Sequence, residues 1–339
     1  MRLNRRQFLA ATASLCVYPL SGGSAEEMNE SRAILDEGLH WLGYSNAEKI
    51  CRRVKEAGFN VLVPCIWDGR GTTWPSRLAP RDERLRGYIK GQGEQFDPVR
   101  ILLDTARKHD LEVHPWFSTG LRNRDDLFPE LAVKGAKSFD WYKPAFRDRI
   151  TEIVLEVVGR YPVDGVNLDY VRFSVPQGKR ADEAERAISG VIERIYKEGK
   201  RMKPNLVVSV DAAPWKDDIK AFGQNAPKWA DEGIVDVVYS MQYQPNPDFG
   251  IIKTIQSKMK RPEAMVVMVG NFDRVGPGDK VVDRRPDRLS ELISKARSLS
   301  KGNGVAVYLY GQMSERQIEA LRKGVFRAKA KPSWRRAKV

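Results

Sequence analysis

The chain has 339 residues, of which 42% are hydrophobic and 9% aromatic, enough for a sizeable core in one large domain or two small ones. Its formal net charge is +14, but three arginines fall within residues 1–25, and six basic residues with no acid lie from Arg327 to the end. The remainder is only mildly basic. It has no basic stripe interleaved with aromatic residues, so we expect no nucleic-acid partner.

Residues 1–25 have the features of an export signal rather than of a folded segment. Residues 4–9, Asn-Arg-Arg-Gln-Phe-Leu, match the twin-arginine pattern, and an apolar run over 8–20 leads to a small-residue cleavage site at 23–25. The apolar run is too short to anchor the mature protein in a bilayer. We therefore predict a periplasmic or secreted protein with no stable membrane insertion after the signal is removed.

The cysteines and histidines form no metal-binding pattern. Cys16 lies in the export signal. Cys51, in a predicted helix, and Cys65, in the next predicted strand, could form a disulfide in an oxidising compartment or remain two buried thiols. The chain has only three histidines: His40, His109 and His114. A three-histidine zinc site is not expected, and we predict neither a metal nor another cofactor.

Along the rest of the chain, short apolar segments alternate about eight times with segments in which apolar residues recur every three or four positions. The predicted strands are residues 38–44, 60–67, 111–117, 165–171, 206–212, 235–243, 265–272 and 305–310. The predicted helices lie near 46–58, 97–110, 144–160, 181–202, 216–232, 250–260, 286–300 and 314–324.

This alternation predicts a parallel sheet closed into a (β/α)₈ TIM barrel, a single domain over residues 26–326. The strongest rival is an open doubly wound sheet, but no glycine-rich phosphate loop follows the first predicted strand. Residues 68–94 form a loop too long for a plain connection, and we expect it to overhang the site. The basic tail over 327–339 is expected to be disordered.

The most informative stretch is residues 161–173, Tyr-Pro-Val-Asp-Gly-Val-Asn-Leu-Asp-Tyr-Val-Arg-Phe. Side chains alternate along a strand, so Asn167 and Asp169 share the face opposite Val166 and Leu168. A buried carboxylate is costly unless it is paired, and ligands bind at the carboxyl ends of barrel strands. Asp169 is therefore a candidate functional residue; the alternative is an Asp that only caps the strand or binds the amides of the next loop.

Polar and aromatic residues also stand at the ends of the other predicted strands, and a barrel would bring them to one mouth. Aromatic faces stack on the apolar faces of sugar rings, while amides and carboxylates bind sugar hydroxyls. Any one of these aromatic residues alone is more often core than site, but their recurrence indicates a carbohydrate site. The candidate substrate-binding residues are Trp67, Asp68, His114, Trp116, Asn167, Tyr170, Trp215, Gln242, Tyr243, Asp273, Tyr308 and Tyr310.

Glycoside hydrolysis normally needs two carboxyl groups that flank the scissile bond, one to protonate the leaving oxygen and one to act as nucleophile or to activate water. Asp169 is the candidate nucleophile or charge-stabilising group. Asp211, the polar residue of the next predicted strand, is the candidate acid. Asp68 and Asp273 are the reserve partners.

Six motifs follow one another along the chain. They are residues 57–64 (Ala-Gly-Phe-Asn-Val-Leu-Val-Pro), 67–69 (Trp-Asp-Gly), 74–76 (Trp-Pro-Ser), 96–98 (Phe-Asp-Pro), 111–117 (Leu-Glu-Val-His-Pro-Trp-Phe) and 164–170 (Asp-Gly-Val-Asn-Leu-Asp-Tyr). Together they resemble the bacterial glycosyl-hydrolase-like 10 family, a (β/α)₈-barrel group of envelope proteins, over about residues 38–310. The resemblance implies action on a bacterial glycan, with peptidoglycan sugar strands as the natural guess. It supports Asp169 as the family's strand-four acid, and His114, Trp116, Gln242 and Tyr243 as substrate-lining residues.

Two positions depart from the family pattern. Relatives commonly carry a second acid directly after the strand-four Asp, where this chain has Tyr170, and a Ser-Pro pair in strand five, where it reads Val-Asp-Ala-Ala-Pro over 210–214. The motif also looks like that of family 18 chitinases, but Val171 occupies the position of their catalytic Glu, so substrate-assisted chemistry is not expected. We predict an exported glycoside hydrolase; a non-catalytic carbohydrate-binding barrel, and a lyase or deacetylase, remain as alternatives.

Overall fold

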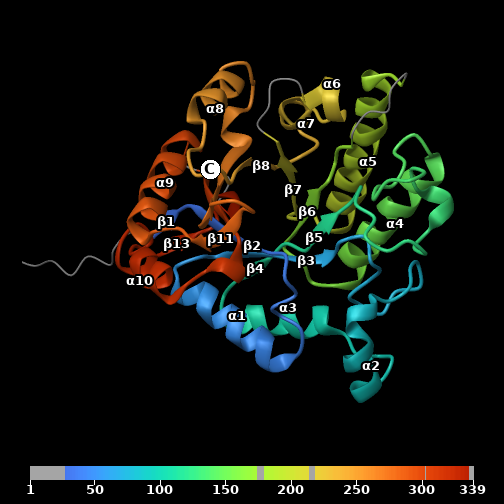
Figure 1. Ribbon diagram of the computed structural model, residues 1–339, viewed down its shortest axis with the longest axis horizontal. Helices are drawn as coiled ribbons and strands as arrows, with labels where there is room; N and C mark the ends of the chain where they lie inside the picture. Colours follow the sequence, from blue (N-terminus) through green and yellow to red (C-terminus); the bar gives the residue numbers. More distant parts are fainter. Residues whose placement is uncertain (1–26, 174–178, 214–217, 302, 336–339) are drawn as a thin grey trace, which may run out of the picture.

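Parallel strands close into a barrel surrounded by helices in the computed structural model of the chain (Figure 1). The structure describes residues 27–173, 179–213, 218–301 and 303–335; the predicted export signal and the candidate Trp215 lie outside these residues. The barrel strands are β2 (Ser31–Asp36), β3 (Val61–Trp67), β4 (Glu112–Val113), β5 (Trp116–Ser118), β6 (Gly165–Asp169), β7 (Val207–Ala212), β8 (Val237–Gln242), β9 (Met265–Gly270) and β12 (Gly304–Tyr308).

These strands follow the order β2-β12-β9-β8-β7-β6-β5-β3-β4, and the further pairing of β2 with β3 closes the ring. Both β4 and β5 pair with β3, one after the other, so that together they fill one position. Every pairing in the ring is parallel. The predicted (β/α)₈ TIM barrel is thereby confirmed, and the carboxyl ends of its strands define the mouth of the barrel.

Helices connect the strands on the outside of the ring (Figure 1). They are α1 (Tyr44–Glu56), α3 (Pro98–Lys108), α4 (Pro144–Arg160), α5 (Ala181–Met202), α6 (Asp218–Phe222), α7 (Ala226–Asp231), α8 (Phe249–Gln256), α9 (Pro286–Leu299) and α10 (Glu315–Lys323). Three begin with proline at the first turn, where a missing N–H costs nothing. The predicted helices overlap the observed ones, except that two short helices, α6 and α7, lie within the predicted range 216–232.

The first strand lies earlier in the chain than predicted. Residues 38–44 are not a strand: Leu39 has a φ of 56°, and α1 begins at Tyr44. The strand that pairs with β3 and β12 is β2, all six residues of which are buried. Its polar members, Ser31 and Arg32, conceal the apolar pattern, because Arg32 is buried through bonds to Glu30 and to backbone carbonyls rather than through apolar packing.

The buried side chains form two apolar layers. Inside the barrel, one cluster includes Ala33 and Leu35 of β2 together with Val63 and Trp116. Between barrel and helices, a larger cluster includes Ile34 of the same strand. Alternate residues of each strand therefore point inward and outward, which fixes which strand-end side chains can face the mouth.

The long loop over residues 68–94 does not overhang the mouth as a whole. It carries α2 (Arg86–Gln92), which lies outside the ring of helices in Figure 1. Trp74 Nε1 and Ser76 Oγ both donate to Glu156 Oε2 of α4, at 2.9 and 2.6 Å. This stretch therefore packs on the outer flank of the barrel.

The tail that the sequence predicted to be disordered is ordered as far as residue 335. Its strand β13 (Ala330–Lys331) pairs in parallel with β1 (Met28–Asn29). The Trp334 ring lies 5.4 Å from the ring of His114, and Arg335 forms an ion pair with the Glu112 carboxylate. The prediction is wrong for residues 327–335 because their aromatic and basic side chains close the amino-terminal end of the barrel.

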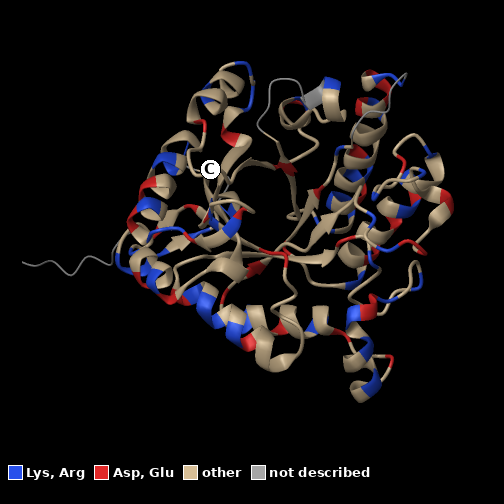
Figure 2. Ribbon diagram, in the orientation of Figure 1, with Lys and Arg blue, Asp and Glu red and all other residues tan. Residues whose placement is uncertain are grey.

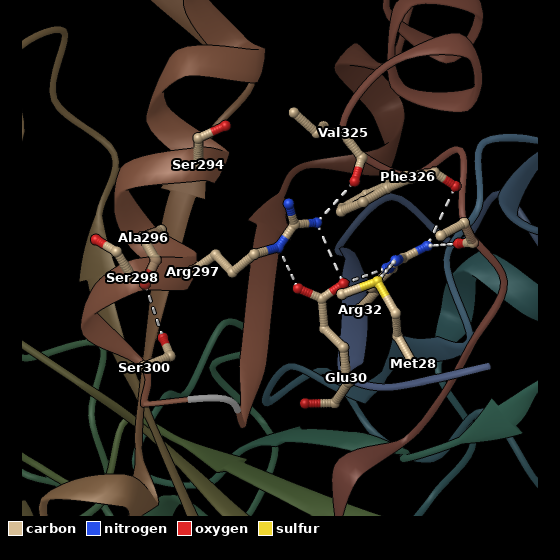
Figure 3. Close-up of polar contacts among 12 residues, drawn as sticks. Met28, Glu30, Arg32, Ser294, Ala296, Arg297, Ser298, Ser300, Val325 and Phe326 are labelled. Atoms are coloured by element: carbon tan, nitrogen blue, oxygen red, sulfur yellow. Dashed lines mark hydrogen bonds and ion pairs between the residues drawn. The ribbon is translucent and has the colours of Figure 1, made fainter. Parts of the chain in front are cut away.

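A buried ionic network joins the two ends of the chain beside this closure (Figure 3). The Glu30 carboxylate lies between two guanidinium groups: Arg32 Nε donates to Oε2 at 2.6 Å, and Arg297 Nη2 donates to the same oxygen at 3.2 Å. Arg32 Nη1 also donates to the carbonyls of Phe326 and Ala328, at 3.2 and 2.8 Å. The charge of Glu30 is therefore compensated where it is buried.

Cys51 and Cys65 are both free, buried thiols. Cys51 belongs to the outer apolar layer and Cys65 to the layer inside the barrel. Of the two alternatives that the sequence allowed, the structure therefore has two buried thiols and not a disulfide. Burial raises the pKa of Cys51 to about 12. Of the helices described, none is long and apolar enough to cross a membrane.

Candidate active site

Asp169 is the last residue of β6 and is 5% exposed at the mouth. Its Oδ1 accepts hydrogen bonds from the Tyr170 backbone N–H (2.6 Å) and from Arg172 Nη1 (2.8 Å). Among the described residues, no hydrogen bond reaches its Oδ2. The hydrogen bond from the Tyr170 backbone N–H matches the alternative role for Asp169, in which it binds the amides of the next loop. Because the guanidinium compensates the charge and one oxygen stays free, Asp169 can also act on a ligand.

Asp211 lies beside Asp169 on the neighbouring strand. The register of β6 and β7 pairs Leu168 with Val210, so the next residues, Asp169 and Asp211, are adjacent. Asp211 is 1% exposed, and its Oδ1 accepts a hydrogen bond from Asn167 Nδ2 at 3.0 Å. Burial, and after it the charge of Asp169, raise the pKa of Asp211 well above its ordinary value. The rise in pKa favours the neutral form of Asp211 beside Asp169.

Three predicted aromatic residues meet in one cluster inside the mouth. Tyr308 stacks on Tyr243 with ring centroids 4.4 Å apart, and the Trp116 ring stands at 69° to it at 6.4 Å. Burial raises the pKa of Tyr243, and the charges of Asp211 and Asp169 add to the effect. The cluster therefore lies near both acids and offers an aromatic platform of the kind that binds sugar rings.

Two further features of this region are unusual for a core. Tyr170 has a φ of 51°, in the left-handed region, and the guanidinium carbon of Arg172 lies 4.7 Å from its ring centroid. A non-glycine residue in this conformation stores about 1–3 kcal/mol of strain. Trp116 Nε1 and Asn167 Oδ1 are buried without a hydrogen-bond partner among the described residues. Strain and unpaired polar atoms of this kind mark functional sites.

Glu37 is a mouth residue that the sequence analysis missed. It directly follows β2, is exposed, and accepts a hydrogen bond from the Tyr308 hydroxyl. The predicted first strand covers residues 38–44, so Glu37 was not recognised as a residue at the carboxyl end of a strand. With the strand at residues 31–36, the inward alternation of Ala33 and Leu35 leads to Glu37 as the next inward position.

Three predicted residues lie at the rim and are held by their own partners. Asp68 forms ion pairs with two arginines, at 2.5 and 2.9 Å. Asp273 lies in β10 (Phe272–Val275), which forms a hairpin with β11 (Lys280–Asp283), and pairs with Arg284 at 2.8 Å. The buried Tyr310 ring stands edge-on to His40 at 5.5 Å. Both reserve acids are therefore held in ion pairs at the rim.

Three other predicted residues lie away from the mouth. A register shift between Cys65 and Trp67 turns the Trp67 side chain into the outer apolar layer. His114 is fully buried against Trp334 at the amino-terminal end. Gln242 is also fully buried, and its Oε1 accepts a hydrogen bond from the backbone N–H that precedes α8, at 3.1 Å. The expected placement at the mouth is wrong for each of them.

The mouth therefore combines the Asp169 carboxyl beside a guanidinium, a second carboxyl with a raised pKa on the next strand, and stacked aromatic rings. Within the described part of the chain, no three or more His, Cys, Asp or Glu side chains are grouped to hold a metal ion. In Figure 2 most Lys and Arg residues lie on the surrounding helices, whereas the barrel strands carry few of them. Carboxyl groups beside an aromatic platform suit a reaction in which positive charge develops on a sugar ring.

Comparison with known sequences finds that part of this chain is similar to glycosyl-hydrolase-like proteins. The model of the family described as Glycosyl hydrolase-like 10 matches residues 35–186. The chain is similar to glycosyl hydrolase DigH of Escherichia coli (strain K12), with 29% identity over 155 residues, 39% of this chain and 35% of that protein. Glycosyl hydrolase YngK of Bacillus subtilis (strain 168) is 28% identical over 136 residues, 36% of this chain and 26% of its own length. The matches thus span about a third of DigH and about a quarter of YngK.

Solved structures share the fold. The glycoside hydrolase domain of PgaB (BpsB) from Bordetella bronchiseptica aligns with a TM-score of 0.63 and 14% identity, covering 86% of this chain and 98% of that domain. A family GH18 chitinase from Cycas revoluta aligns with a TM-score of 0.58 and 12% identity, covering 86% and 97%. These findings confirm the resemblance to the glycosyl-hydrolase-like 10 family over residues 35–186, on a TIM barrel shared with glycoside hydrolases.

Proposed function

We propose that the chain is an exported glycoside hydrolase that cleaves O-glycosidic bonds of a bacterial envelope polysaccharide, with peptidoglycan glycan strands as the substrate. The observation that carries the proposal is Asp169 at the mouth, charge-compensated by Arg172 and adjacent to the stacked rings of Tyr243 and Tyr308. A sugar on this platform would present its anomeric carbon to the free Oδ2 of Asp169. From there the carboxylate can attack that carbon or activate water.

Asp211 supports Asp169 in this proposal. The raised pKa of Asp211 favours its neutral form and so reduces the negative charge beside Asp169. Asp211 also accepts a hydrogen bond from Asn167. A proton donor for the leaving oxygen is also required. Asp211 is the donor that the sequence predicted, but at 1% exposure it has little access to a substrate.

The envelope as the place of action rests on the twin-arginine pattern at residues 4–9. After removal of the export signal with its three arginines, a formal net charge of +11 remains, which also favours association with anionic envelope polymers. Peptidoglycan is the substrate that the family resemblance implies for an exported bacterial protein.

The test uses purified residues 26–339 on peptidoglycan glycan strands, with and without stem peptides. The products are identified by mass spectrometry beside an Asp169→Asn variant. We expect cleavage by the wild type alone. If neither protein cleaves these strands or a wider panel of envelope glycans, the proposed activity is wrong.

A second candidate function is a non-catalytic carbohydrate-binding barrel. The observation in its favour is that Asp169 already holds an arginine and a backbone amide, while its neighbour Asp211 is almost inaccessible. Binding of glycan strands with a measurable dissociation constant and without any product would favour this function over hydrolysis.

A further inference from the structure

The proposed function requires a proton donor for the leaving oxygen, and this donor has not yet been assigned. Glu37, the exposed acid that directly follows β2, is the candidate. Glu37 differs from Asp211 in access: Glu37 is exposed, whereas Asp211 is 1% exposed. A general acid must come within hydrogen-bond reach of the oxygen that it protonates. A glutamate at the surface of the mouth can do so without any rearrangement of the barrel.

The position of Glu37 around the ring also fits this role. Its strand β2 is flanked by β12 and β3, while β6 and β7 lie three and four places away, on the far side of the ring. Glu37 and Asp169 therefore face each other across the mouth. Asp169 and Asp211, in contrast, lie side by side on neighbouring strands. Hydrolysis needs carboxyl groups that flank the scissile bond, and a pair on opposite sides of the mouth is placed to do so.

Tyr308 is hydrogen-bonded to Glu37 and lies within electrostatic reach of Asp169. Its hydroxyl donates to the Glu37 carboxylate, and its ring stacks on Tyr243. Burial raises the pKa of Tyr308, and the charges of Glu37 and Asp169 both add to the effect. The Tyr308 side chain thus lies within the field of both carboxylates, so a sugar seated on the platform would have one acid on each side.

We propose that Glu37 is the catalytic proton donor of the glycoside hydrolase and that Asp169 is its partner across the mouth. This role rests on the proposed function. The Glu37 proton passes to the glycosidic oxygen while the bond from the anomeric carbon to that oxygen breaks, its electron pair staying on the oxygen. The oxygen of a water molecule forms the new bond to the anomeric carbon, directly or after an intermediate bond to Asp169, and the water proton goes to a carboxylate.

The proposed step requires that a bound sugar favour the neutral form of Glu37. A sugar that covers the Tyr243 and Tyr308 rings would remove water from the Glu37 carboxyl beside them. Loss of water disfavours the charged form of a carboxyl group and favours the neutral form that carries the proton. The Tyr308 hydroxyl can accept a hydrogen bond from neutral Glu37 as readily as it donates one to the carboxylate.

The test compares Glu37→Gln and Asp211→Asn with the wild type and with Glu56→Gln, an exposed glutamate of α1. The probes are peptidoglycan glycan strands and two aryl glycosides of N-acetylglucosamine oligosaccharides, one with a 2,4-dinitrophenyl and one with a phenyl leaving group. Glutamine at position 37 keeps the shape and an acceptor for the Tyr308 hydroxyl, but has no acidic proton.

We expect Glu37→Gln to lose about 10²–10⁴-fold in kcat/KM on glycan strands and on the phenyl glycoside. The dinitrophenyl glycoside needs no protonation of its leaving group, so its loss should be less than about tenfold. Equal loss on both aryl glycosides, or unchanged activity on all probes, would overturn the role of Glu37. The leaving-group pattern in Asp211→Asn instead would assign the proton to Asp211. If the wild type cleaves no probe, the proposed function fails, and this role with it.

Discussion

The Glu112 carboxylate at the amino-terminal end of the barrel makes a quantitative prediction about stability. Burial alone would raise its pKa, but hydrogen bonds from His114, Arg335 and Trp334 outweigh that effect and lower the pKa from 4.5 to about 2. Its side chain is 15% exposed, and Trp334 Nε1 donates to it at 2.9 Å. At about 1.4 kcal/mol per pH unit, the lowered pKa corresponds to about 3 kcal/mol of folding free energy.

The sign follows from the direction of the shift. A carboxyl whose pKa is lower in the folded state stabilises the fold above its unfolded pKa, and that contribution is lost as the pH falls through the folded pKa. We therefore expect Glu112→Gln to lower the free energy of unfolding by about 3 kcal/mol at pH 7. The difference between wild type and variant should shrink between pH 4.5 and pH 2.

Urea denaturation followed by circular dichroism at several pH values measures this difference. Glu56→Gln, a change of the same chemistry on the exposed face of α1, is the matched control and should stay within about 0.5 kcal/mol of the wild type. The reasoning is refuted if Glu112→Gln is as stable as this control at pH 7. It is also refuted if the loss does not depend on pH.

Four further substitutions, at three positions, test the mouth. Asp169→Asn should lower kcat by about 10²–10⁴-fold with a shift of the thermal midpoint below about 4 °C; a collapse of the midpoint would make Asp169 structural. Tyr308→Phe keeps the ring on Tyr243 and should leave KM within about threefold of the wild type, whereas Tyr308→Ala should raise KM more than tenfold; equal KM values would exclude a stacking platform. Gly120→Ala would place a Cβ 2.6 Å from the Tyr170 carbonyl oxygen, so calorimetry should show a loss of about 1–3 kcal/mol, and an unchanged midpoint would contradict the packing described.

The sequence predicts the helices of this barrel well because their periodicity reflects burial on one side only. It also places Asp169 and Asp211 on neighbouring strands, and the register of β6 and β7 agrees. Strand β2 escapes prediction because its buried Arg32 reads as a surface residue when its distant ionic and backbone partners are unknown. Glu37 is missed because it directly follows this unpredicted strand.

The errors at the mouth arise from side-chain direction rather than from position along the chain. Trp67 stands at the end of β3, as expected, but a register shift after Cys65 reverses the face on which it lies. Gln242 follows the regular alternation of β8, in which Tyr239 belongs to the inner layer, and so points outward. A change of one position in register inverts the direction of a strand residue, and short apolar segments do not reveal such changes.

The pairing of β1 with β13, and of β2 with β12, has a consequence for how the chain folds. Both strands at the start of the chain take a partner from its far end, so these pairings require closure of nearly the longest loop available. Contacts of such high sequence separation form slowly. During synthesis, β2 would have only β3 beside it until β12 has left the ribosome, and β1 would have no strand partner until β13 has done so. Completion of the ring is therefore a step that depends on the whole chain, and a product truncated before Trp334 would keep an open amino-terminal end.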